Sequence, residues 1–362
     1  MAEPTHRTQE WFRLQANSCG RLGSPFYAGL LERCADRIAS GDATLRAVLA
    51  GHEDDPGPSA LALRLMGAVH RLVLDGAAQA LAATYPSVGG NGSVEQAWPA
   101  FVAVLDQHAA AIRASLEHAP QTNEVGRSAS LIGGLLRLAE DTGLPIRLRE
   151  IGSSAGLNLR ADHFAVSVGG VHLAGPVGSP VQLADAWEGP LPPMVPLEIT
   201  DRWGSDISPI DPTHDDGARR LLSYVWPDQT ARFERLRGAI EVSRTVPALV
   251  ERMDAPTAVR ALDLARGQVT VLWHSIMWQY LSRADKDAVL ALLDELGGEA
   301  TESAPLAHLS LEPRRRSTGS EHENLVVLRT WPSGHAVVLG SAPAHGVPVR
   351  WEPPTVWSQA DR

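Results

Sequence analysis

The segment REIGSSAGLNL, residues 149–159, admits two incompatible interpretations. It follows the apolar run LPIRL (144–148), which predicts a buried strand, and it leads into residues that predict a helix. One interpretation is a glycine-rich turn that approaches a cofactor, with Glu150 at the end of the strand. The other is a GxSxG elbow that presents Ser154 as a nucleophile. Both place a functional site where this strand ends.

The chain before this segment predicts a helical module. Segments such as YAGLLERCADRIAS and LALRLMGAVHRLVLDGAAQALAA repeat apolar residues at helical spacing. The turn-prone segments HEDDPGPS and YPSVGGNGS interrupt the pattern. We therefore expect a helical cap domain over residues 1–120, built of about four or five helices.

From residue 121 onward helices and strands alternate, which predicts an α/β domain over 121–362. We expect a Rossmann-like, mostly parallel sheet with an antiparallel hairpin at its edge, formed by the last strands around Pro332-Ser333-Gly334. The segment HFAVSVGGVHLAG has alternating apolar residues on both sides of a Gly-Gly pair, which predicts a β-hairpin. This hairpin belongs to an insertion at about 163–196.

Acidic and polar residues stand at the ends of the predicted parallel strands. Ligands of open α/β sheets bind at the carboxyl ends of the strands, so these positions are candidates for chemistry. They are Glu150, Asp206, Asp254 and His274. A carboxylate at the end of the second strand, Asp206, is placed to accept hydrogen bonds from ribose hydroxyls, and Asp254 lies where an adenine amino group would bind.

The amino-acid composition disfavours some classes of binding partner and some cellular locations. The formal net charge of −10 and a pI of about 5.7 disfavour nucleic acid and anionic membranes as partners. The N-terminal MAEPTHRTQEWF lacks the apolar core of a signal peptide, and no run is long enough for a membrane span, so we expect a cytoplasmic protein. Cys19 and Cys34 have no metal-binding spacing, and no metal site is expected. The oligomeric state is left open.

The order of these features resembles that of class I S-adenosylmethionine-dependent methyltransferases, over residues 121 to 351. The shared features are E-x-G-x-x-x-G at Glu150, G-x-D at Asp206, an acid and a small residue at Asp254-Ala255, a fourth strand with a polar exit, and a closing hairpin. The resemblance implies S-adenosylmethionine as cofactor, a small-molecule substrate, and methyl transfer to an oxygen or nitrogen nucleophile.

The resemblance also implies roles for residues. Glu150 would lie near the amino-acid end of the cofactor and Asp206 at the ribose, whereas both would cap helices in a purely structural interpretation. His274 would act as a base beside the methyl group or merely fill polar space. Glu124 and Arg127 belong to TNEVGR (122–127), which opens the helix before the first strand, so their position places them near the glycine-rich turn independently of the resemblance. Arg127 would pair with a carboxylate of the substrate or of the cofactor's methionine end, or the segment would form an inter-domain salt bridge. The full cofactor set is Glu150, Gly152, Ser153, Ser154, Gly156, Asn158, Asp206, Ile207, Asp254 and Ala255.

Two departures from the methyltransferase pattern keep other classes open. Ser154 stands where the middle glycine is expected, and Asp206 lies 54 positions after Gly152 (206 − 152), against roughly 20 in a compact nucleotide-binding unit. A serine hydrolase would use Ser154 with His345 as its histidine, but the helical residues 1–120 leave no room for the strands and oxyanion loop expected before the elbow. A non-catalytic protein that binds S-adenosylmethionine is the third class.

A second resemblance covers nearly the whole chain. The segments TNEVGRSASLIGGLL, EIGSSAGLNLRADHF, DISPIDP and YVWPDQ are together similar to an uncharacterised bacterial family, domain of unknown function 2332. This resemblance implies no particular activity.

Overall fold

The computed structural model describes residues 4–53, 55–317 and 319–357. The chain forms two compact units, which are described separately below. Unit 1 consists of Met1–Thr122 and His214–Glu234, and unit 2 consists of Asn123–Thr213 and Arg235–Arg362.

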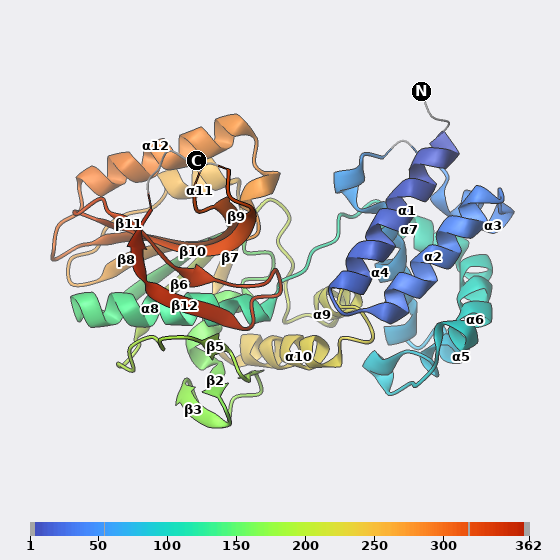
Figure 1. Cartoon of the computed structure of the whole chain (residues 1–362), viewed down its shortest axis with the longest axis horizontal. Coiled ribbons are helices and arrows are strands. Elements are labelled where there is room, and N and C mark those ends of the chain that lie inside the picture. The colour runs from blue at the N-terminus through green and yellow to red at the C-terminus, as the bar shows by residue number, and fades with distance from the viewer. Residues whose placement is uncertain (1–3, 54, 318, 358–362) are drawn as a thin grey trace. The chain divides into compact units, whose positions relative to one another are not determined.

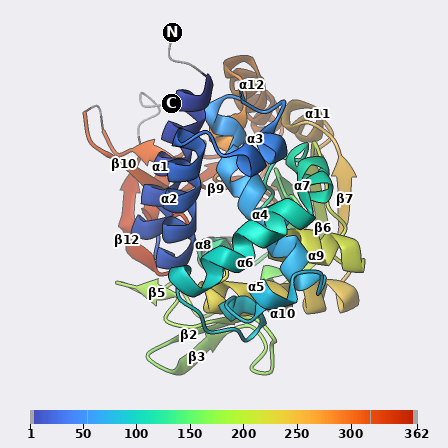
Figure 2. The same cartoon turned by 90° about the vertical axis from the view of Figure 1, so that its right-hand side faces the viewer.

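Unit 1 is helical (Figure 2). Before residue 123 the described residues form seven α-helices, so the prediction of four or five was wrong. These are α1 (Pro4–Arg21), α2 (Pro25–Ala39), α3 (Ala43–Leu49), α4 (Leu61–Leu74), α5 (Gln79–Ala82), α6 (Val94–Gln107) and α7 (Ala109–Leu116). Helices α3 and α5 contain only 7 and 4 residues, too few to show a helical period in sequence. The two predicted turn segments do lie between helices.

Residues 214–234 belong to unit 1, although the sequence assigned them to the sheet domain. Helix α9 (Asp215–Ser223) packs on α4, and Trp226 is buried in the core of unit 1 near Tyr27. His70 of α4 contacts the carbonyl oxygen of Ser223 at 3.1 Å. The long amphipathic segment at 217–244 is therefore divided around Pro227 into α9 and α10 (Thr230–Thr245).

Unit 2 contains a mixed sheet of nine strands in the order β5-β12-β11-β10-β9-β8-β1-β6-β7, within the described residues (Figure 1). The strands are β1 (Ile146–Ile151), β5 (Trp187–Glu188), β6 (Ile199–Asp206), β7 (Leu249–Arg252), β8 (Val269–Ser275), β9 (Leu306–Arg315), β10 (His322–Trp331), β11 (Ala336–Ser341) and β12 (Val349–Val356). Strands β7, β6, β1, β8 and β9 are mutually parallel, and β9 to β12 form an antiparallel meander. The predicted α/β class with a mostly parallel sheet is confirmed. The predicted hairpin, β10–β11, lies inside the sheet because β12 and β5 continue beyond it.

Helices cover both faces of this sheet (Figure 1). Helices α11 (Ala255–Arg260) and α12 (Arg283–Gly298) pack on one face, where Leu272 and Leu306 meet Val289. Helix α8 (Ser128–Thr142) lies on the other face, where Gly134 lets it approach Leu309. Burial on both faces explains why β8 is a continuous apolar run in sequence.

The insertion after β1 holds the predicted hairpin. Strands β2 (Ala165–Val168) and β3 (Val171–Ala174) are antiparallel around Gly169-Gly170, and β4 (Gln182–Leu183) extends them to a small sheet. The chain then returns to the main sheet through β5, which pairs with β12. The insertion is therefore fastened to the far edge of the main sheet.

The residues after the glycine-rich turn do not form the expected α-helix. They form a kinked 3₁₀ helix, η4 (Leu157–His163), in which Arg160 has φ −107° and ψ 22°. The guanidinium of Arg160 donates to the carbonyl oxygens of Gly156 and Val246, both at 2.7 Å. The glycine-rich turn therefore leads into the start of a 3₁₀ helix and not of an α-helix.

Within the described residues no helix combines the length and the apolarity that crossing a membrane requires.

Candidate functional site

The strand order reverses between β1 and β8, which is where ligands bind in open α/β sheets. At the carboxyl end of β1 the chain turns at Gly152, whose φ is +65°. A Cβ atom at Gly152 would come within 2.9 Å of the side chain of Met277, which follows β8. The glycine thus allows the segment after β8 to approach the turn closely.

Glu150 is the main titratable group at this point. Its side chain is buried, and it pairs in register with Trp273 of β8. The pKa of Glu150 is raised to about 8, chiefly by burial and also by the charge of Asp206, against the opposing effects of Asn158, Trp273 and Arg127. Among the described residues, Glu150 Oε2 has no hydrogen-bond partner. At neutral pH this carboxyl group is therefore mostly protonated.

The TNEVGR segment and the glycine-rich segment meet in a polar cluster beside Glu150. Asn158 Oδ1 accepts a hydrogen bond from Ser128 Oγ at 2.8 Å, and Asn158 Nδ2 donates to the carbonyl oxygen of Glu124 at 3.5 Å. The backbone N–H of Leu157 donates to Asn123 Oδ1 at 2.8 Å. The predicted residues Glu124, Glu150 and Asn158 are thus brought together, and Asn123 is a member that the sequence analysis missed.

Glu124 and Arg127 fasten neighbouring loops to this cluster. Glu124 Oε1 accepts from the N–H of Gly126, and its Oε2 lies 3.3 Å from His345 Nδ1. Arg127, in the 3₁₀ helix η3 (Val125–Arg127), donates to the carbonyl oxygens of Ala344 at 3.1 Å and Ser275 at 3.2 Å. Arg127 therefore ties the end of β8 to the loop between β11 and β12. These contacts give both residues a positioning role within unit 2.

Asp206 fastens the glycine-rich turn to the end of β6. Its Oδ2 accepts from the N–H of Ser154 and its Oδ1 from the N–H of Ser208, both at 2.8 Å. Ser153 donates to the carbonyl oxygen of Ser205 through both its N–H and its hydroxyl. Ile207, a predicted cofactor contact, is 72% exposed. Asp206 thus binds backbone N–H groups of two turns, and neither of these groups belongs to a helix that it would cap.

Ser154 has the backbone conformation of a nucleophile elbow, but no histidine positioned to act as its general base among the described residues. Its φ of +55° is unusual for a residue with a side chain. Its hydroxyl is buried and has no hydrogen-bond partner in the described part of the chain. His345 faces Glu124, and His274 is engaged by Glu312 and His308. Activating a serine hydroxyl requires a base within hydrogen-bond reach, and this geometry supplies none.

Asp254 and Ala255 do not join the cluster. Asp254 is exposed, and its carboxylate caps α11 by accepting from the N–H of Thr257 at 2.8 Å. The hydrogen bonds from Thr257 lower the pKa of Asp254. Ala255 is buried in the core beneath α11 and α12. The observed role of Asp254 is thus to cap α11.

Replacing Asp254 by alanine should lower the free energy of unfolding by about 1 kcal/mol, because the first turn of α11 loses its cap. Asp254→Asn should keep most of this stability, since asparagine caps equally well. Urea unfolding followed by circular dichroism measures both. Equal stability of the alanine variant and the unmodified protein would contradict the capping role.

His274 points away from Glu150. Successive residues of a strand face opposite sides, so Trp273 lies on the side of Glu150 and His274 on the side of α12. There His274 Nδ1 lies 2.7 Å from Glu312 Oε1, and its Nε2 lies 2.9 Å from His308 Nε2. The expectation that His274 stands beside the cofactor turn was wrong for this reason. His308 was missed, although the alternation HLSLE (308–312) marks one polar side of an apolar strand.

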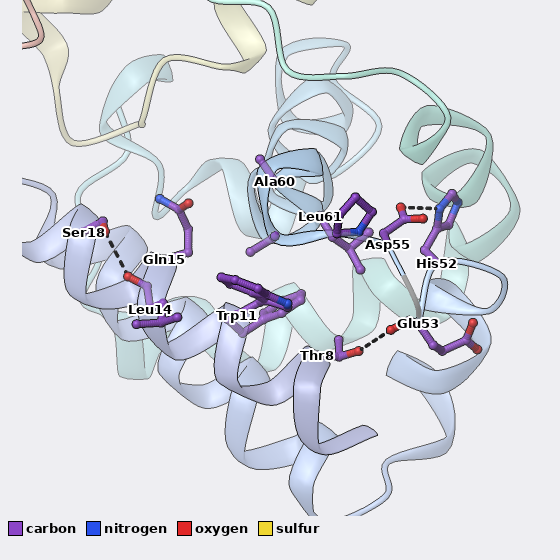
Figure 3. Close-up of a pocket in the computed structure, with 14 residues that line it drawn as sticks. Thr8, Trp11, Leu14, Gln15, Ser18, His52, Glu53, Asp55, Ala60 and Leu61 are labelled. Carbon is purple, nitrogen blue, oxygen red and sulfur yellow. Dashed lines mark hydrogen bonds and ion pairs between the residues drawn. The ribbon is translucent and has the colours of Figure 1, made fainter. Parts of the chain in front are cut away.

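Unit 1 has a small pocket of its own, of about 170 Å³ (Figure 3). The ring of Trp11 lies against Gly57, Thr8 donates to the carbonyl oxygen of Glu53, and His52 pairs with Asp55 at 3.0 Å. None of the predicted site residues lines this pocket. It therefore adds nothing to the cluster around Glu150.

Comparison with known proteins identifies a family and no characterised relative. No curated protein and no solved structure matches the chain. A family model described as "Uncharacterized protein conserved in bacteria (DUF2332)" matches residues 9–351, so the chain belongs to the DUF2332 family.

Proposed function

We propose that unit 2 is Rossmann-like, binds S-adenosylmethionine at the carboxyl ends of β1, β6 and β8, and transfers its methyl group to an oxygen or nitrogen atom of a small molecule. The observation that carries the proposal is the parallel strand order β7-β6-β1-β8-β9. Numbered along the chain, this is the order 3-2-1-4-5 of nucleotide-binding doubly wound sheets. Glu150, near the end of β1, and Gly152, directly after β1, lie where this strand order reverses direction.

The residues present fit the amino-acid end of this cofactor. Glu150 Oε2 is a buried polar atom with no partner among the described residues, next to a turn that lacks a side chain at Gly152. Burial keeps the Glu150 carboxyl protonated although the charge of Arg127 opposes this, whereas an ammonium group directly beside it would favour the carboxylate. Met277 supplies a flexible apolar wall over the turn.

The cofactor would supply an electrophilic methyl group, and this chain would supply position and exclusion of water. Arg127 would hold the end of β8 through Ser275, and Asp206 would hold the glycine-rich turn through Ser154. Both are positioning residues in this proposal, since each forms hydrogen bonds with the backbone of the loops that surround the site.

Calorimetric titration with S-adenosylmethionine and S-adenosylhomocysteine tests the proposal. We expect the unmodified protein to bind both and Gly152→Ala to bind neither, because the new Cβ displaces Met277 and strains the turn. Gly143→Ala is the matched control, because Gly143 has the same φ of +65° and no atom within 4 Å of its added Cβ. Gly143 lies before β1, at the opposite end of the strand from the glycine-rich turn. Absence of binding by the folded, unmodified protein would refute the proposal.

Binding should also release protons near pH 7. An ammonium group beside Glu150 lowers its pKa from about 8, so up to about one proton should leave per ligand bound. Titrations in phosphate and in Tris, which differ in ionisation enthalpy, measure this number. Glu150→Gln should bind without proton release. Equal enthalpies in the two buffers for the unmodified protein would place the ligand's amino group away from Glu150.

One observation favours a non-catalytic variant of the same proposal. His274, the expected base, is on the other face of the sheet, and Glu124 and Arg127 hold loops. A protein that only binds the cofactor would bind it in calorimetry and give no methylated product with any acceptor. Methyl transfer from labelled cofactor to a metabolite extract separates the two.

A further inference from the structure

A cavity in unit 2 lies on the α12 side of the sheet. It has a volume of about 620 Å³ and is lined by α12, by β9, β10 and β11, and by Trp357. This size suits a small-molecule ligand, since such pockets measure roughly 300–1,000 Å³. The cavity faces the side of β8 opposite to Glu150, so its occupant does not depend on the cofactor proposal.

The cavity is strongly basic in a chain whose net charge is −10. The cationic side chains among the described lining residues are Arg283, Lys286, Arg314, Arg315 and Arg329, and the one carboxylate is Asp287. Some of this charge is compensated, because Arg283 pairs with Asp287 at 3.0 Å and Arg329 with Asp294 at 2.7 Å. Lys286 has no such ion pair among the described residues, and its positive charge favours an anionic occupant.

Lys286 is the cation best placed to bind such an anion. It is the only lysine of the chain, and it is half-buried on the inner side of α12. In the described ranges its ammonium group forms no ion pair and no hydrogen bond with the protein. A half-buried ammonium group without a partner is poorly solvated, so a ligand anion would relieve this.

Arg314 contacts both a polar and an aromatic residue of the cavity. Its guanidinium donates to Ser310 Oγ at 3.2 Å and lies over the ring of Trp357, 4.6 Å from the centroid. Trp357, together with Trp278 and Leu290, gives the cavity an apolar part beside its basic part. The lining therefore suits a ligand with an anionic end and an aromatic or aliphatic body.

A buried chain of polar groups ends at the cavity wall. Glu312, which is fully buried, accepts from His274 Nδ1 at 2.7 Å and from the N–H groups of Met277 and Trp278. His274 stacks on Trp278, with ring centroids 5.0 Å apart, and its Nε2 contacts Nε2 of His308, which lines the cavity. If His274 carries its proton on Nδ1 and donates it to Glu312, its Nε2 is an acceptor and His308 must donate from its own Nε2. The carboxylate thereby fixes the orientation of His308.

We propose that this cavity binds a small organic anion, a phosphate or carboxylate attached to an apolar body, with Lys286 and Arg314 at the anionic group and Trp278 and Trp357 at the body. His308, oriented through His274 and Glu312, lies in the wall of the same site. Guanidinium and ammonium groups bind both kinds of anion, and the choice between them is left to the experiment.

The test is calorimetric titration with phenyl phosphate, phenylacetate and benzyl alcohol, which share an aromatic body and differ in charge. At least one anion should bind, more weakly at high salt, and benzyl alcohol should bind far less. Lys286→Gln should weaken the anion about tenfold or more. Arg350→Gln, at an exposed arginine of β12, is the matched control and should change nothing. The preferred anion assigns the ligand class.

Three outcomes would overturn the proposal: no anion binding by the folded protein at millimolar concentration, equal binding by Lys286→Gln, or equal binding of benzyl alcohol. A spectroscopic readout locates the ligand independently. Binding should shift the imidazole NMR signals of His308, identified by their loss in His308→Gln. It should leave unchanged those of His70, which is enclosed by Ser87 and Ser223 in unit 1. A shift at neither histidine would place the anion elsewhere.

Discussion

Glu150→Gln is expected to make the protein more stable above pH 8 than the unmodified protein is, although it removes a side chain at the centre of the candidate site. Burial raises the pKa of Glu150 from 4.5 to about 8 in the folded state. Between these values the folded state binds a proton that the unfolded state has lost, so stability falls as pH rises through this window. Glutamine resembles the protonated form and avoids the cost of burying a charge.

The expected magnitude is large because the shift is large. Each pKa unit corresponds to about 1.4 kcal/mol, so the full difference above pH 8 is on the order of several kcal/mol. Below pH 4.5 both states are protonated and the advantage of glutamine should vanish. Urea unfolding at intervals from pH 4.5 to 9 measures the difference in unfolding free energy between the two proteins.

Glu302→Gln provides the control, because Glu302 is an exposed glutamate of the same unit. Its difference from the unmodified protein should stay near zero across the pH range. A pH-independent difference for Glu150→Gln would mean that Glu150 is ionised in the folded protein at neutral pH. The polar cluster would then have to contain a cation that compensates it.

The strands of the sheet could be predicted because buried strands are rich in apolar residues, which the sequence shows directly. The apolar segments at 146–151 and 269–275 form central strands covered on both faces. The Gly-Gly pair at 169–170 marked its hairpin. The meeting of TNEVGR with the glycine-rich turn follows from adjacency of α8 and β1, and the sequence placed Glu124 and Arg127 near it for this reason.

The helix expected after the glycine-rich turn could not be excluded from local pattern. LNLRADH has the composition of a helix start, but the contacts of Arg160 with Gly156 and Val246 stabilise a 3₁₀ turn. Val246 lies far along the chain, so no window of local sequence contains this interaction. The same limit applies to residues 214–234, whose membership in unit 1 depends on contacts with α2 and α4.

The sequence predicted the strand that carries His274, but not the face of the sheet on which its side chain lies. The sequence placed it correctly on β8, but its side of the sheet depends on register with β1 and β9. A shift of one residue moves a side chain to the opposite face. With that register, Trp273 lies on the same face as Glu150. His274 lies on the opposite face, beside His308 and Glu312. The residues that the sequence suggested for one site therefore belong to two separate sites.

Gly126 and Gly346, which are far apart in sequence, allow a close contact between two backbone segments. No local sequence pattern predicts this contact. A Cβ atom at Gly126 would lie 2.2 Å from the carbonyl oxygen of His345, and one at Gly346 would lie 2.2 Å from the backbone nitrogen of Arg127. The loop between β11 and β12 thus lies directly on η3. The contacts of Arg127 with Ala344 and of Glu124 with His345 depend on this approach.

Gly346→Ala is therefore expected to be strongly destabilising, by about 3 kcal/mol or more, because it combines a φ of +85° with a clash between backbones that have no flexible side chain to move. Gly334→Ala is the matched control: Gly334 has a φ of +71° in the β10–β11 turn and nothing within 4 Å of its added Cβ, so it should cost only about 1 kcal/mol. Urea unfolding compares the two. Equal costs would show that the loop can withdraw from η3 freely. A larger cost for Gly346→Ala, with loss of ligand binding at the β1 turn, would show that this contact holds Glu124 and Arg127 in place.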